Sequence, residues 1–176
     1  METKQTVSNV DVAIAGAGLV GALTALMLAR RFPHWQIALI DPAHALPKQD
    51  PRTLALARRS QEALAELRVW QHISSATPIE HIHISDSTGP GSATLHAQKE
   101  GVESLGYVVQ AVDVQQALAE ACQEQANIDW RRGESIQKVQ ATANCSELSL
   151  TSGAQLAARL LLVTDGSHSP TRSLLG

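Results

Sequence analysis

The motif GAGLVG at residues 16–21 fits the pattern GxGxxG and constrains the fold more than any other feature of the sequence. It stands between an apolar run at 10–15 and a stretch of helix-forming residues at 19–31. A second apolar run follows at 36–40 and ends in Asp41. The three glycines would allow a tight turn, the approach of a pyrophosphate to the backbone, and close packing of helix on strand. We therefore predict a βαβ unit that binds a dinucleotide at a helix N-terminus.

Asp41 is the predicted partner of the adenosine ribose. It lies 20 positions after Gly21 (41 minus 21), where the second strand is expected to end. A carboxylate at this place can accept hydrogen bonds from ribose hydroxyls, and its charge disfavours a 2′-phosphate. The pattern does not separate NAD from FAD, because both cofactors contain the adenosine diphosphate half.

The rest of the chain predicts an α/β protein of the Rossmann type, with a parallel sheet that starts as βαβ and additional antiparallel strands. Residues 79–85 alternate in polarity and predict a hairpin with 92–97 around a turn at 88–91. Other strands are predicted at 107–110, 128–130, 135–140, 148–151 and 160–163, and further helices at 60–67 and 112–125. In the last helix, Val114, Leu118 and Ala121 share one side.

Charge and cysteine content exclude several classes of partner. The net charge is -3 and no run of basic residues is longer than a pair, so we expect no nucleic-acid partner. Cys122 and Cys145 lack a CxxC spacing, which favours reduced thiols and a cytoplasmic protein. No stretch approaches the roughly 18 apolar residues that span a bilayer, so any contact with a membrane is expected to be peripheral. His81 and His83 share a strand face, but we find no third ligand and predict no metal site.

Several segments resemble flavoprotein aromatic hydroxylases. Residues 165–172, DGSHSPTR, are similar to the DGxxSxxR motif of the family members that carry FAD in one chain. Segments similar to those of the ubiquinone-biosynthesis hydroxylases stand at 50–57, 69–71, 82–86 and 105–110. The resemblance extends from Val10 to Arg172. Val163 and Thr164 depart from it, because the family has a small pair such as Gly-Ala before the Asp-Gly.

The resemblance implies FAD as cofactor, NAD(P)H as reductant, and hydroxylation of a polyprenylated phenol with O₂. It also implies that Arg52 contacts the pyrophosphate and ribityl region, that Gln110 bonds the ribityl or phosphate side, and that Asp165 contacts the flavin end. The backbone near Val139 would lie by the adenine. Motif and resemblance together predict the cofactor-binding residues Gly16, Gly18, Leu19, Val20, Gly21, Asp41, Arg52, Gln110, Val139 and Asp165. No catalytic acid or base is predicted.

The family's second flavin motif, Gly-Asp-Ala followed by a His-Pro segment, is absent from the sequence. We therefore expect residues 1–176 to form the FAD-binding domain of a longer two-domain hydroxylase, truncated before the substrate-covering part and inactive alone. Two alternatives remain open. One is a non-catalytic dinucleotide-binding module, and the other is an NAD-dependent dehydrogenase or flavin reductase. Other ubiquinone-biosynthesis proteins are the partners that the resemblance suggests.

Overall fold

The computed structural model describes residues 7–86, 89 and 91–176. The chain divides into two compact units. One unit joins the residues up to Leu46 with residues 118–176, and the other runs from Pro47 to Ala117. Each unit is described by itself.

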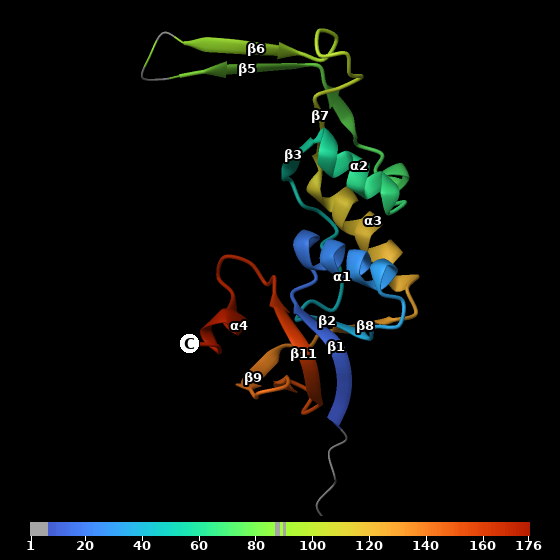
Figure 1. The fold of residues 1–176 in the computed structure, drawn as a ribbon, viewed down its shortest axis with the longest axis vertical. Helices are drawn as coiled ribbons and strands as arrows, with labels where there is room; N and C mark the ends of the chain where they lie inside the picture. The colour runs from blue at the N-terminus through green and yellow to red at the C-terminus, as the bar shows by residue number, and fades with distance from the viewer. Residues whose placement is uncertain (1–6, 87–88, 90) are drawn as a thin grey trace, which may run out of the picture. The chain divides into compact units, whose positions relative to one another are not determined.

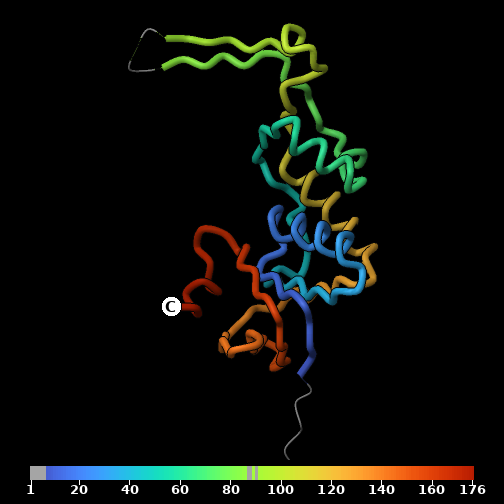
Figure 2. Tube along the Cα trace, in the orientation of Figure 1, coloured from blue at the N-terminus to red at the C-terminus, as the bar shows by residue number. Residues whose placement is uncertain are grey.

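A six-stranded mixed sheet forms the first unit. Its strands, in spatial order, are β8 (Ile128–Arg132), β2 (Ile37–Asp41), β1 (Val7–Ala15), β11 (Gln155–Val163), β10 (Ser146–Leu150) and β9 (Ile136–Ala141). The first four strands are parallel, whereas β10 and β9 add antiparallel pairs. Figure 2 shows β1 and β11, far apart in sequence, running side by side. The predicted α/β class with a βαβ start and antiparallel additions is confirmed.

Helix α1 (Leu19–Arg31) completes the βαβ unit and begins and ends where the sequence predicts. Its buried residues are small or aliphatic: Gly21, Ala22, Ala25, Leu26 and Ala29. Small side chains on this face let the helix axis approach β1 and β2 closely, and residues 12–15 of β1 and 37–40 of β2 are almost fully buried. The helix ends at Arg31, and Pro33 follows two residues later, where a continuing helix would lose a hydrogen bond.

Three elements of this unit differ clearly from the sequence prediction. Strand β1 begins at Val7 rather than at 10. Strand β11 begins at Gln155 rather than at 160, because residues 155–158 pair in parallel with 7–10 of β1. Only alternate residues of that added part, Leu156 and Ala158, are fully buried, so it lacks the continuous apolar run. The short helix α4 (Pro170–Ser173) was not predicted, because four residues are too few for a helical period.

The second unit contains a three-stranded antiparallel sheet and a separate hairpin. Strands β3 (Thr53–Ala57), β7 (Gly106–Gln110) and β4 (Thr77–Ile79) pair in that order, and β5 (His81–Ser85) pairs with β6 (Ser92–His96) (Figure 1). Helices α2 (Arg58–Glu66) and η1 (Trp70–His72) lie between β3 and β4 along the chain. The predicted strand at 79–85 is interrupted at Glu80, and part of the predicted turn at 88–91 lies outside the described residues.

Helix α3 (Ala111–Gln123) continues from the second unit into the first. Val114, Leu118 and Ala121 are buried, as their spacing predicts. No helix in the described part of the chain is long and apolar enough to cross a membrane.

Candidate dinucleotide-binding site

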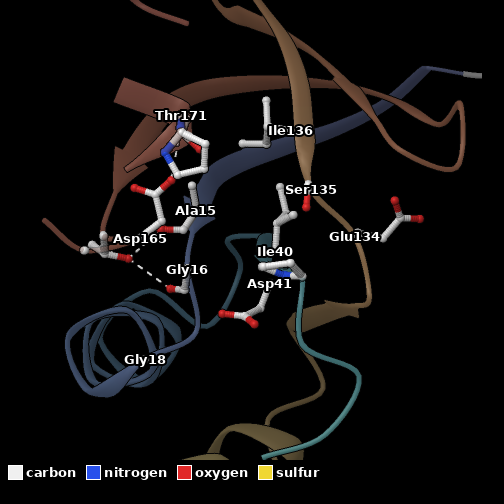
Figure 3. Close-up of a pocket in the computed structure, with 14 residues that line it drawn as sticks. Ala15, Gly16, Gly18, Ile40, Asp41, Glu134, Ser135, Ile136, Asp165 and Thr171 are labelled. Atoms are coloured by element: carbon white, nitrogen blue, oxygen red, sulfur yellow. Dashed lines mark hydrogen bonds between the residues drawn. The ribbon is translucent and has the colours of Figure 1, made fainter. Parts of the chain in front are cut away.

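An open cleft of about 460 Å³ lies at the carboxyl ends of β1, β2 and β11, within the first unit. The chain passes from β1 to β2 on one side, whereas β11 adds to β1 on the other. This is a topological switch point, the place where open α/β sheets bind ligands. The cleft is lined by Ala15, Gly16, Gly18, Ile40, Asp41, Pro42, Glu134, Ser135, Ile136, Thr164, Asp165, Gly166, Pro170 and Thr171 (Figure 3). Its volume is in the range of small-molecule sites.

The three glycines of the motif have different surroundings. Gly16 has a φ of +93°, and a Cβ there would lie 2.7 Å from the Cα of Asp165. A Cβ on Gly21 would collide with the carbonyl of Gly16 and lie 2.6 Å from the Thr164 hydroxyl. Gly18 lines the cleft, yet in the described part of the chain a Cβ there would meet no atom within 4 Å. Gly16 and Gly21 therefore serve packing, and Gly18 leaves space in the cleft.

The N-terminus of α1 offers donors for an anion. Gly18 is the N-cap and has no side chain, and the N–H of Ala22 donates to the Gly18 carbonyl at 2.9 Å. The N–H groups of Leu19, Val20 and Gly21 precede this bond and have no partner within the helix. The positive end of the helix dipole also favours negative charge here. None of the residues that line the cleft is basic. Within the cleft, a phosphate would therefore be held by hydrogen bonds from these backbone amides.

Asp41 fixes the glycine loop. Its Oδ2 accepts a hydrogen bond from the N–H of Ala17 at 2.6 Å, and its Oδ1 accepts one from Ala43 at 2.8 Å. Each carboxylate oxygen can accept a further hydrogen bond. Asp41 thus lines the cleft next to the glycine loop, and the contact with a ribose remains a prediction.

Residues of the DGxxSxxR motif form hydrogen bonds with one another, and one of these bonds is accepted by Asp165. The N–H of Thr171 donates to Asp165 Oδ2 at 3.1 Å, and the N–H of Arg172 donates to Ser169 Oγ, the N-cap of α4, at 2.9 Å. The Arg172 guanidinium donates to the carbonyl of Ser167 at 3.1 Å. Asp165 Oδ1 is buried and has no hydrogen-bond partner among the described residues. An unpaired buried acceptor at a cleft is costly unless a ligand supplies a donor.

The pKa of Asp165 lies below its ordinary value. Burial raises this pKa, but hydrogen bonds from Ser169 and Thr171 favour the ionised form and outweigh the burial. The carboxylate therefore stabilises the fold fully above the pKa of an unfolded aspartate, about 3.9. That contribution is lost as the pH falls through the lower folded-state pKa.

The lowered pKa of Asp165 predicts how the stability of an Asp165→Asn variant depends on pH. The substitution should lower the free energy of unfolding at pH 6, and the difference from the unsubstituted chain should shrink as the pH approaches 3. Urea unfolding of both proteins at several pH values measures the difference between their free energies of unfolding. The other carboxylates are the same in both proteins, so their effects cancel in this difference. A difference that is constant from pH 6 to pH 3 would contradict a role of the ionised carboxylate.

Glu134 and Ser135 form a wall of the cleft that the sequence analysis did not identify. Glu134 Oε2 accepts hydrogen bonds from the Thr151 hydroxyl at 2.8 Å and from the N–H of Ser152 at 3.1 Å. The N–H of Thr151 donates to the Ser135 carbonyl at 3.0 Å. The pKa of Glu134 is lowered, chiefly by hydrogen bonding with Ser152. No local motif marks these residues, because their partners lie about one hairpin away in sequence.

Thr164, one of the two departures from the family pattern, ties β11 to the glycine loop. Its Oγ1 lies 2.8 Å from the carbonyl oxygen of Ala15 and 2.9 Å from that of Gly16, so the hydroxyl donates to this pair. The two acceptor residues, Ala15 and Gly16, are labelled in the lining of the cleft in Figure 3. Although Thr164 departs from the family pattern, its hydroxyl thus holds the glycine loop in place.

The remaining predicted residues lie outside this cleft's lining. Arg52 and Gln110 belong to the second unit, where the Arg52 carbonyl accepts from Ala111 and Thr53 pairs with Gln110. The Arg52 guanidinium binds Asp50, with Nη2 2.6 Å from Oδ2, and holds the pKa of that carboxyl at about 2.

Val139 lies in β9 and packs against the core. It is not among the residues that line the cleft, whereas Ile136, three residues earlier in the chain, is. Its predicted place near the adenine stays a prediction.

The glycine loop, the exposed helix N-terminus and the carboxylates at a switch point define a dinucleotide-binding α/β protein. A family model described as "FAD binding domain" matches residues 9–176, and the chain belongs to this family.

Known proteins resemble the chain over nearly its whole length. An uncharacterized protein of Synechocystis sp. is 35% identical over 97% of this chain and 42% of the relative. The ubiquinone hydroxylase UbiM of Neisseria meningitidis is 28% identical over 94% of this chain and 38% of the relative. The crystal structure of p-nitrophenol 4-monooxygenase PnpA from Pseudomonas putida has a TM-score of 0.77 and 20% identity over 97% of this chain and 44% of that one. The chain thus spans less than half the length of these relatives.

Proposed function

We propose that this chain is the FAD-binding portion of a flavoprotein monooxygenase. The proposed reaction hydroxylates a polyprenylated phenol of ubiquinone biosynthesis with O₂ and NAD(P)H. The single observation that carries the assignment of a dinucleotide is the cleft at the switch point, where Gly18 leaves open space in front of a helix N-terminus. This cleft suits NAD and FAD alike, and FAD is proposed because the chain belongs to the FAD binding domain family. Membership of the FAD binding domain family and the similarity to a ubiquinone hydroxylase support it.

The residues present fit such a cofactor. A side chain at Gly18 would fill the space that a pyrophosphate needs, and the amides of Leu19 and Val20 would hold its charge. Asp41 would accept from the ribose, and the unpaired Oδ1 of Asp165 would accept from a hydroxyl toward the flavin end. By the resemblance, Arg52 and Gln110 are proposed to contact the phosphate and ribityl groups of the cofactor.

Bound flavin would supply the activation of O₂ and the transfer of oxygen to the ring. The chain's own groups would bind and orient it, and no acid or base on this chain is assigned to the chemistry. Segments 50–57 and 82–86 resemble 2-octaprenyl-6-methoxyphenol hydroxylase, so a polyprenylated methoxyphenol is the substrate to test first.

We expect Asp41→Ala to weaken FAD and ADP alike, by about 1–3 kcal/mol, the scale of a hydrogen bond to a charged group. The reason is that both ligands carry the adenosine ribose, and that Asp41 also holds the N–H of Ala17 in the glycine loop. Isothermal titration with each ligand measures the two affinities. A loss for FAD with no loss for ADP would place Asp41 away from the ribose.

The reaction is tested with ¹⁸O₂, NADH or NADPH, and the methoxyphenol. Because the chain spans less than half of its relatives, we expect FAD binding by the chain alone and labelled phenol only when it is joined to the remaining segment of such a relative. Reduction of the flavin with no label in the phenol would favour a flavin reductase. A chain that binds ADP but not FAD would favour the non-catalytic module.

A further inference from the structure

The hairpin of β5 and β6 carries three histidines on one face. His81 and His83 stand two residues apart on β5, and His96 lies directly opposite His81 on β6. Residues with this spacing point to the same side of a two-stranded sheet. The spacing within β5 suggests His81 and His83 as a pair, but the structure pairs His81 with His96 instead.

The imidazoles of His81 and His96 face each other through the same ring nitrogen. Their Nδ1 atoms are 2.8 Å apart, and the ring planes meet at 74° with centroids 4.8 Å apart. At this distance one Nδ1 carries a hydrogen and the other offers its lone pair. If that hydrogen moves to Nε2 of its ring, the Nδ1 lone pairs of both rings can point at one ion between them.

From this geometry we infer that His81 and His96 form a site for a divalent transition-metal ion such as Cu²⁺ or Zn²⁺. Imidazole nitrogen suits both ions, and Cu²⁺ is held more tightly. On binding, the shared hydrogen moves from Nδ1 to Nε2 of the same ring through solvent, so both rings stay neutral and each Nδ1 donates its lone pair to the ion. Metal–nitrogen bonds of about 2.0–2.1 Å in a tetrahedral arrangement place two nitrogens about 3.3 Å apart. The exposed hairpin needs to open by only about half an ångström.

Water molecules complete the coordination. In the described part of the chain no group of three or more His, Cys, Asp and Glu side chains is arranged to hold a metal. The site is thus a two-ligand site, weaker than a structural zinc site with four protein ligands.

His83 supplies a matched control. Its Nδ1 lies 3.1 Å from the Thr94 hydroxyl, one cross-strand pair further along the same face. His83→Ala and His81→Ala therefore make the same substitution at exposed positions of the same strand. Only His81 belongs to the metal-binding pair.

The test titrates the purified protein with Zn²⁺ against a chromophoric chelator and records the electron paramagnetic resonance of bound Cu²⁺. We expect one ion per chain, at least a tenfold weaker affinity in His81→Ala and in His96→Ala, and less than a threefold change in His83→Ala. The Cu²⁺ spectrum should show two nitrogen ligands, and one in His96→Ala. Circular dichroism checks that each variant is folded, and His96→Gln replaces His96→Ala if that variant is not.

Two results would overturn the inference. One is an affinity for Zn²⁺ that is the same in the unsubstituted chain and in the double variant H81A/H96A. The other is a loss in His83→Ala as large as that in His81→Ala, which would show unspecific binding by surface histidines. Neither result bears on FAD binding, so this inference and the proposed function succeed or fail separately.

Discussion

Gly18→Val should leave the chain folded and lower its affinity for both FAD and ADP about a hundredfold, or about 2.8 kcal/mol. A Cβ at this position meets no atom of the described residues within 4 Å, so we expect the chain to tolerate the side chain when no ligand is bound. The same side chain enters the cleft in front of the α1 N-terminus, where a pyrophosphate must approach the backbone. The effect is therefore expected in binding and not in folding.

Titration with FAD and with ADP measures the binding, and thermal unfolding without ligand measures the stability of the same samples. Gly18→Ala is the matched control, because its single methyl group adds less volume to the cleft and should cost less affinity. Unchanged affinity of Gly18→Val for both ligands would remove the glycine loop from the site.

Gly21→Ala should have the opposite profile and destabilise the fold by about 1–3 kcal/mol, the usual cost of overpacking a close contact. The new Cβ would collide with the backbone carbonyl of Gly16 and approach the hydroxyl of Thr164. Alanine elsewhere in a helix is normally better than glycine by about 1 kcal/mol, so a loss of stability is diagnostic of this collision.

Urea unfolding of Gly21→Ala beside Gly18→Ala separates the two positions. The N-cap substitution Gly18→Ala meets no neighbour and should cost at most about 1 kcal/mol. If Gly21→Ala is as stable as the unsubstituted chain, α1 does not pack against the strand in the way described.

The βαβ unit at the start of the fold could be predicted because its signals are local. The apolar runs of β1 and β2, the helix formers of α1 and the glycines at 16–21 each act through neighbours in sequence. Gly16, Gly18 and Asp41 were predicted from the same local pattern, and the structure brings them to one cleft with Asp165.

Other parts depend on contacts that sequence spacing does not reveal. Glu134 reaches the cleft wall because Thr151 and Ser152, on the next hairpin, hold its carboxylate. The first half of β11 is a strand because β1 pairs with it across more than 140 residues of chain. The partner of His81 is His96, on the opposite strand, and a search along one strand finds only His83. In each case a long-range partner decides the role of the residue.

The binding of FAD by the purified chain, followed by flavin absorbance and then by displacement with ADP, tests the central claim most directly. We predict that FAD binds at one site per chain, that ADP displaces it, and that Gly18→Val weakens the binding of both ligands about a hundredfold. Flavin binding that neither ADP nor Gly18→Val affects would contradict the claim that the cleft at the α1 N-terminus holds the adenine dinucleotide.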